Sequence, residues 1–292
     1  MGSSFFVVML VSLPGLAETE TEAATEGEVV SIESAGLLPI PDYSGDIWTR
    51  SHLTGDWGEV RSHLASKGVQ AEIRWNQTVQ SVVDGGRNED TDYGGSLNYD
   101  LTLDLMRMGV LPGALIRFRA ESRYGDSINS ATGSILPANL DGLFPLTSPI
   151  DDDFLPITVT SLNYTQFLSE HFAVTVGKFD TLDGDPNEFA GGRGVSQFLN
   201  SNFIFNPSLA LIVPYSTLGF GIIILPNPHL TITSLMINTS DASESTGFGD
   251  IGDGATWSTE AQLQYRLGNL PGGANLVASL TERIQSQGCN PT

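Results

Sequence analysis

Apolar and polar side chains alternate along Ser96–Tyr124 with a period of two residues. Every second residue from Leu97 to Leu105 is apolar or aromatic, and the residues between them are Asn, Asp or Thr. After a Gly-x-x-Pro-Gly break at 109–113, the alternation resumes. Successive strand side chains point to opposite faces, so this pattern predicts a hairpin of two long strands. Each arm has about ten residues, enough for a tilted strand to cross a bilayer, although a sheet packed on a soluble core shows the same alternation.

The alternation recurs from Val69 onward and predicts nine strands in all. Short turns, expected near 108–114, 168–172, 225–230 and 267–274, alternate with long polar connections near 84–95, 125–156, 180–217 and 239–256. Long loops at one end and tight turns at the other are typical of an outer-membrane barrel, whose tight turns face the periplasm. The predicted fold class is therefore an all-β, transmembrane, antiparallel up-and-down β-barrel over residues 69–284.

Four segments outside the strands have other patterns. Residues 1–17 are predicted to be a signal peptide, because an apolar run is followed by the small-x-small triplet Gly15-Leu16-Ala17, although no Lys or Arg precedes the run. Residues 18–47 are acidic and without periodicity, which predicts a flexible segment. Residues 48–68 are predicted to form a helix, with Asp56 and Glu59 capping its first turn. The tail 285–292 loses the alternation.

Composition narrows the functional classes. A net charge of -21 excludes a nucleic-acid-binding role, because phosphates require a basic face. The single cysteine, Cys289, gives no disulfide framework, and the four histidines show no metal-ligand spacing. Nucleophile-elbow, phosphate-loop and dinucleotide motifs are absent from the sequence, so we expect no enzyme, cofactor or metal. The acidic run 180–188 lacks the glycine of an EF-hand loop, and a looser calcium loop is the alternative there.

If the apolar faces meet lipid, the opposite faces line a water-filled lumen. The charged residues predicted to line it are Arg74, Asp100, Asp104, Arg117, Arg119, Glu121, Arg123, Lys178, Glu260 and Arg266. Two-residue spacing places Arg117, Arg119 and Arg123 on one face, and guanidinium groups match paired hydroxyls or carboxylates. These three arginines are the candidates for a selective constriction. The alternative for each residue is a hydrated wall position whose individual loss changes little.

Four stretches together resemble one family: LTGDWGEVRSHLASKGV (53–69), SLNYDLTLDLMRMGVLPGA (96–114), GKFDTLDGDPNEFAGG (177–192) and FLNSNFIFNP (198–207). They resemble the carbohydrate-selective porins of the OprB type. The resemblance implies an outer-membrane barrel of about sixteen strands that passes small neutral sugars by diffusion. It also implies an N-terminal helix at the periplasmic mouth and a long loop, 188–214, folding toward the pore. The matched positions, chiefly structural, are Gly55, Asp56, Trp57, Gly58, Asn187, Glu188, Phe189, Phe198, Asn200 and Asn206.

Nine strands are fewer than the resemblance implies. In lipid an open sheet edge leaves backbone groups unpaired, so we expect the sequence to be a truncated piece of a longer barrel, with a small closed barrel of eight or ten strands as the alternative. The expected location is the outer membrane of a Gram-negative bacterium, in contact with its lipid, as a monomer or trimer. A secreted or surface-attached β-rich binding protein without a pore is the alternative function. An outer-membrane hydrolase is a third, which would need a Ser–His pair.

Overall fold

The structure is a computed structural model that describes residues 36–142, 156–181, 192–195, 198–204, 213–268 and 270–283, together with Phe5–Phe6 and Thr147–Ser148. The predicted signal peptide, apart from Phe5–Phe6, lies outside the described residues. So do residues 18–35 of the acidic segment and the tail 285–292.

Nine long strands follow one another in the sheet in the order in which they occur in the sequence. They are β2 (Val69–Ser81), β3 (Thr91–Asp104), β4 (Ala114–Gly125), β6 (Thr158–Ser169), β7 (Phe172–Asp180), β8 (Ser216–Asn227), β9 (Leu230–Asn238), β10 (Gly254–Leu267) and β11 (Leu270–Arg283). Each pairs with the next in antiparallel register. Two strands of two residues complete the sheet: β1 (Phe5–Phe6) pairs with β11, and β5 (Thr147–Ser148) pairs with β4. The predicted all-β, up-and-down antiparallel fold and its nine strands are confirmed.

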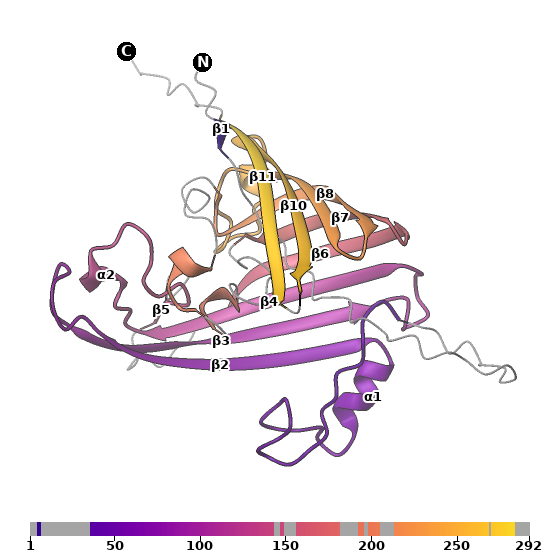
Figure 1. The fold of residues 1–292 in the computed structure, drawn as a ribbon, viewed down its shortest axis with the longest axis horizontal. Coiled ribbons are helices and arrows are strands. Elements are labelled where there is room, and N and C mark those ends of the chain that lie inside the picture. The colour runs from indigo at the N-terminus through magenta and orange to yellow at the C-terminus, as the bar shows by residue number, and fades with distance from the viewer. Residues whose placement is uncertain are drawn as a thin grey trace, which may run out of the picture.

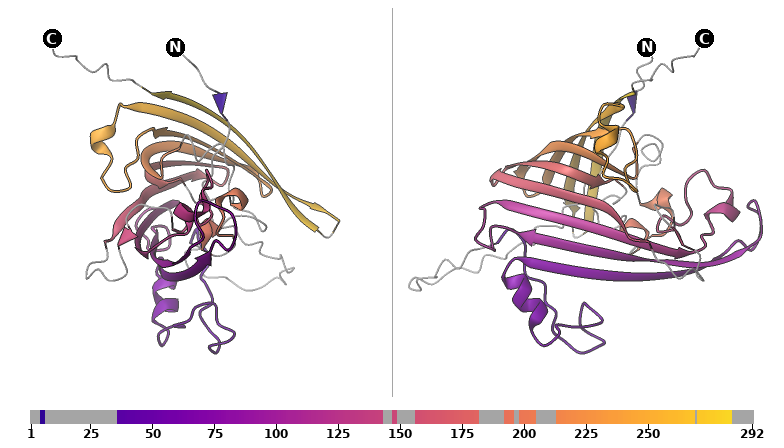
Figure 2. Two further views of the ribbon diagram at one scale, coloured as in Figure 1. Left: turned by 90° about the vertical axis from the view of Figure 1, so that its left-hand side faces the viewer. Right: turned by 180° about the vertical axis from the view of Figure 1, so that it is seen from behind.

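The sheet curves but does not close within the described residues. Strands β2 and β11 lie at opposite ends of the run of long strands and do not pair with each other. Figures 1 and 2 show the sheet as a strongly twisted, curved wall, with β2 and β3 as long, nearly parallel ribbons and β10 and β11 crossing them at a steep angle. The short turns join the strands at one end, and the long connections join them at the other.

The sheet buries polar side chains and exposes apolar ones. On β3 the alternate residues Ser96, Asn98 and Asp104 are buried, whereas Ile73 and Trp75 on the neighbouring strand β2 are 69% and 66% exposed. The same inversion continues across the sheet, with exposed apolar side chains at Val79, Leu162, Val176, Phe220, Trp257, Leu263 and Leu276. A soluble sheet would show the reverse, so this pattern fits strands whose outer face meets lipid.

One region departs from this pattern. By register, Ile223, Leu235 and Val277 share a face with Glu260, and all four residues are buried. The inner face of β8, β9 and β11 is therefore partly aliphatic. Within β9 the apolar pattern changes face, because Leu235 lies on the inner face and Ile232 on the outer one.

The N-terminal helix is shorter than predicted. Helix α1 covers only Val60–Ser66, instead of residues 48–68. Gly55, Trp57, Gly58 and Glu59 have φ values of 61°, 55°, 68° and 73°, and a right-handed helix requires negative φ. Of the two residues predicted to cap the first turn, Glu59 makes no side-chain cap. The prediction for Asp56 is confirmed, because its carboxylate accepts hydrogen bonds from the backbone and hydroxyl of Ser62 in that turn, at 2.7 and 2.6 Å.

No helix in the described part of the chain is long and apolar enough to cross a membrane.

Candidate functional site

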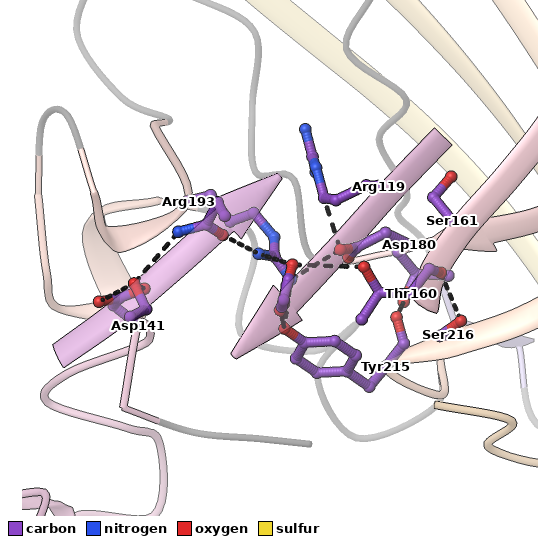
Figure 3. A network of polar contacts seen from close by, with 12 residues as sticks. Arg119, Asp141, Thr160, Ser161, Asp180, Arg193, Tyr215 and Ser216 are labelled. Atoms are coloured by element: carbon purple, nitrogen blue, oxygen red, sulfur yellow. Dashed lines mark hydrogen bonds and ion pairs between the residues drawn. The ribbon is translucent and has the colours of Figure 1, made fainter. Parts of the chain in front are cut away.

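A buried network of ionic side chains lies on the inner face of the sheet, near the end of β4 from which the long connections leave (Figure 3). Strand β4 supplies Glu121 and Arg123. The connection from β4 to β6 supplies Asp141, and the connection from β7 to β8 supplies Arg193 and Tyr215. The site therefore forms where two long connections fold back against the wall.

Glu121 is at the centre of this network, and its side chain is completely buried. One carboxylate oxygen accepts a hydrogen bond from Nη1 of Arg193 and lies 3.3 Å from the hydroxyl of Thr160. The other oxygen accepts the Tyr215 hydroxyl at 2.6 Å and Nη2 of Arg123 at 3.2 Å. One wall carboxylate thus binds two guanidinium groups that come from different elements.

Arg123 is held from its other side by Asp141. Its Nη1 donates to the Asp141 carboxylate at 2.8 Å, and both side chains are 2% exposed. Asp141 also accepts the Ser96 hydroxyl at 2.7 Å and the Asn76 amide at 2.7 Å. These contacts join the connection from β4 to β6 to the inner faces of β2 and β3.

Arg193 connects the network to β7. Its Nη2 lies 2.6 Å from a carboxylate oxygen of Asp180, the last residue of that strand. The same oxygen lies 3.7 Å from Nη1 of Arg119, whose Nε donates to Asp100 at 2.7 Å. Arg119 and Asp100 are each 22% exposed, so this pair is the more accessible end of the network.

The network is close to charge balance. Three guanidinium groups, from Arg119, Arg123 and Arg193, face four carboxylates, which belong to Asp100, Glu121, Asp141 and Asp180. Burial raises the pKa of the Tyr215 phenol, although the two nearby guanidinium groups oppose this rise. The phenol therefore stays protonated and donates to Glu121, while the Arg193 guanidinium carbon lies 5.2 Å from the centre of its ring.

The structure brings four of the predicted lumen residues together: Asp100, Arg119, Glu121 and Arg123. Arg117 shares their face by register, opposite Thr102 on β3 and Asn163 on β6, and is half-buried. Arg123 differs from the other two arginines because it is enclosed by carboxylates. It is also buried, whereas Arg117 and Arg119 are half-buried.

Asp104 lies at the opposite end of β3 and holds the N-terminal segment. One carboxylate oxygen accepts the backbone amides of Leu37 and Leu38, at 2.6 and 3.1 Å. The other accepts the backbone amide of Arg107 at 2.9 Å, and the Arg107 side chain donates to the carbonyl of Leu38 at 2.7 Å. The buried Asp104 carboxylate, which is 2% exposed, therefore fixes the segment at residues 37–38 near the short turns.

The remaining predicted lumen residues do not converge on the network. Lys178 is buried and donates from Nζ to the carbonyls of Val159 and Ser245, at 2.6 and 2.9 Å. Glu260 is buried on β10 and accepts the Gln262 amide at 3.0 Å. Arg74 is exposed and lies 3.3 Å from Glu72, and Arg266 is exposed near the end of β10.

The family-motif residues fall in two groups. Gly55, Asp56, Trp57 and Gly58 form the turns before α1, where the Trp57 ring lies 5.1 Å from the Arg61 guanidinium carbon. Phe198 packs on Phe203 with ring centroids 5.4 Å apart, and the Asn200 side chain caps Ser201–Phe203 by accepting the Asn202 amide at 2.9 Å. Four positions lie outside the described residues: Asn187, Glu188, Phe189 and Asn206.

The sequence pattern missed Asp141, Arg193 and Tyr215, and did not connect Asp180 with the wall arginines. All except Asp180 lie in connections without periodicity, so no pattern aims them at the sheet. The local signal at Arg193 is its position between glycines in Gly-Gly-Arg-Gly, which marks an unusual backbone. Its φ of 55° is in the left-handed region, at a cost of about 1–2 kcal/mol for a residue with a Cβ. Within the described residues, no group of three or more His, Cys, Asp or Glu side chains is arranged to hold a metal ion.

Comparisons with known proteins agree with this architecture. The model of the carbohydrate-selective porin family OprB matches residues 88–287, more than half of the chain. No curated protein matches this chain. The high-pH structure of Pseudomonas putida OprB is similar with a TM-score of 0.61 at 18% identity, covering 79% of this chain and 56% of that one. The low-pH structure of the same porin gives a TM-score of 0.48 at 17% identity, covering 78% of this chain and 60% of that one.

The chain thus spans little more than half the length of the Pseudomonas porin, and at this identity the likeness shows the fold alone. The family model, which rests on the sequence, covers the strands from the start of β3 to the end of β11. We conclude that this chain belongs to the OprB family of carbohydrate-selective porins.

Proposed function

We propose that this protein forms the wall of an outer-membrane channel through which small neutral sugars diffuse passively. The single observation that carries the proposal is the inverted burial of the sheet, with charged and hydroxyl side chains on the inner face and large apolar side chains on the outer face. Lipid satisfies the outer face, and the polar inner face suits water and polar solutes. Membership of a family of sugar-selective porins supports the choice of solute.

The electrostatics of the network support a neutral solute. Its guanidinium and carboxylate groups are nearly balanced and lie within ion-pair distance of one another. Such a wall offers many hydrogen-bond donors and acceptors without the strong field of a single charge sign, which would select ions. The accessible pair of Arg119 and Asp100 presents a donor and an acceptor side by side, the arrangement that neighbouring sugar hydroxyls match.

The roles of the individual residues follow from these positions. We assign solute contact to the lumen-facing candidates, foremost Arg117, Arg119 and Asp100, and a structural role to Asp104 and the family-motif residues. We assign no catalytic residue, cofactor or metal. The location is the outer membrane of a Gram-negative bacterium, and the protein acts there as a monomer or a trimer.

The test is a swelling assay on protein extracted with detergent from the outer-membrane fraction of its native host. Liposomes that contain the protein should swell in isotonic solutions of monosaccharides, at rates that fall as the sugar grows larger. Protein-free liposomes and liposomes containing the boiled protein are the controls. A product found in the soluble fraction, or liposomes that do not swell in any sugar, would contradict the channel and favour a β-rich binding protein.

A further inference from the structure

Arg193 is the point at which the connection between β7 and β8 meets the wall. It lies in the turn Gly192–Gly194, away from both flanking strands along the chain. Its guanidinium nevertheless reaches Glu121 on β4 and Asp180 at the end of β7. Strand β6 lies between these two strands in the sheet, so one side chain spans three strands of the wall.

The described residues after Arg193 are fixed to the other long connection. The backbone of Leu140 donates to the carbonyl of Leu199 at 2.8 Å, and Ser201 donates to the carbonyl of Pro137 from its amide at 3.1 Å and its hydroxyl at 2.7 Å. Gly194 approaches Asp141 so closely that a Cβ atom would lie 2.8 Å from the Asp141 amide. The two connections thus lie against each other beside the network.

The backbone at Arg193 is held in an unfavourable conformation. A φ of 55° suits glycine, and both neighbouring residues are glycines with positive φ. A residue with a long side chain persists in such a conformation only where surrounding contacts compensate, and such positions concentrate at functional sites. The compensating contacts here are its ionic bonds to Glu121 and Asp180 and its hydrogen bond to the Tyr215 hydroxyl.

We propose that Arg193 is a positioning residue that holds the stretches 192–195 and 198–204 against the inner wall and thereby sets the width of the sugar path. The inference rests on the proposed channel function. Neither Glu121 nor Asp180 depends on Arg193 alone, because Arg123 lies 3.2 Å from the first and Arg119 lies 3.7 Å from the second. Loss of Arg193 therefore leaves each of these two carboxylates with one guanidinium partner but removes their bridge to the connection.

The test compares Arg193→Ala, Arg193→Gly and Arg193→Lys with the parent protein. Arg193→Gly removes the side chain while keeping a residue that suits the backbone, so it separates loss of the bridge from backbone strain. Arg193→Lys retains the charge but, because an ammonium group is a point charge without a planar fork, it cannot bridge two carboxylates equally well. Arg87→Ala, which removes an exposed arginine in the connection between β2 and β3, is the matched control.

Two measurements are made on each variant in liposomes. Hydrogen exchange of backbone amides in 192–204 should accelerate at least tenfold in Arg193→Ala and Arg193→Gly, and less in Arg193→Lys. The swelling rate in a trisaccharide, relative to that in a monosaccharide, should rise severalfold in the same order. Arg87→Ala should change neither quantity.

The outcomes separate the two claims. A parent protein that fails to conduct monosaccharides refutes the channel itself. A parent that conducts, with exchange in 192–204 and size preference unchanged in both Arg193→Ala and Arg193→Gly, refutes the positioning role alone. If Arg193→Ala does not assemble, the same two measurements on Arg193→Gly and Arg193→Lys decide the positioning role. Arg193→Gly suits the backbone, and Arg193→Lys keeps the charge.

Discussion

Replacing Glu121 by glutamine isolates the energetic role of the network. The two side chains have nearly the same shape, but glutamine keeps one acceptor oxygen and turns the other into a donor. In the wild-type protein all four partners of Glu121 donate to it: Arg193, Arg123, Tyr215 and Thr160. The two donors that bind the oxygen replaced by the amide nitrogen therefore lose their acceptor and face another donor.

The expected cost follows from the hydrogen bonds that glutamine cannot accept. A hydrogen bond to a charged group contributes about 1.5–3 kcal/mol, and a glutamine forfeits about two of them. Removing one partner of a buried ion pair costs about 3–5 kcal/mol. Here each guanidinium retains a second carboxylate, Asp141 for Arg123 and Asp180 for Arg193. We therefore expect Glu121→Gln to lower the free energy of unfolding by about 3 kcal/mol.

The assay is urea-induced unfolding of the protein in lipid vesicles, followed by tryptophan fluorescence. The control is the same substitution at Glu72, which is 35% exposed and lies 3.3 Å from Arg74. Exposed pairs contribute less than about 1 kcal/mol, so Glu72→Gln should be nearly neutral. Equal unfolding midpoints for the two variants would refute the reasoning that the network stabilises the folded wall.

Three further predictions concern other parts of the structure. Asp104→Asn replaces an acceptor of the amides at 37–38 with a donor, so hydrogen exchange at these amides should accelerate at least tenfold, and unchanged exchange would show that the clamp is dispensable. Burial raises the pKa of the Tyr215 phenol above that of a free tyrosine, which ionises at a pH of about 10. The protonated phenol therefore stabilises the folded protein fully below that pH, and this stabilisation is lost as the pH rises through the pKa of the folded state. Ultraviolet titration should accordingly show a late-ionising phenol that Tyr215→Phe removes. In variants that keep only Trp75 or only Trp257, which are 66% and 44% exposed on the outer face, brominated lipids should quench the fluorescence strongly, whereas quenching by water-soluble acrylamide alone would place them outside the bilayer.

The strands and their order were predictable because their signal is local. A two-residue period assigns each side chain to a face without reference to the rest of the chain, and the register confirms this for Asp100, Arg119 and Glu121. The predicted alternation of short turns and long connections also follows from the spacing of these periodic segments. The sheet from β2 to β11 could therefore be derived from the sequence alone.

The partners of the wall residues were not predictable in this way. Arg193 is 72 residues from Glu121, and Tyr215 is 92 residues from Arg123, and both come from connections without a repeating pattern. The same limit explains Asp104, whose alternation places it in the lumen although it binds an N-terminal segment 66–67 residues away. The helix was predicted too long because its apolar spacing extends across glycines that adopt positive φ.

The decisive experiment on the polar-lined channel is chemical labelling of two adjacent residues on β3. Asp100 lies on the polar face of the sheet beside Arg119, and Leu101, which pairs with Phe118, lies on the opposite face. In a Cys289→Ser background, each is replaced by cysteine and treated with a charged, water-soluble thiol reagent while sugar flux into liposomes is recorded. A polar-lined sugar channel predicts that Asp100→Cys reacts and that its flux falls, while Leu101→Cys reacts only with a lipid-soluble maleimide and keeps its flux. Labelling of Leu101→Cys by the charged reagent with loss of flux, and an inert Asp100→Cys, would show that the polar face does not line the sugar path.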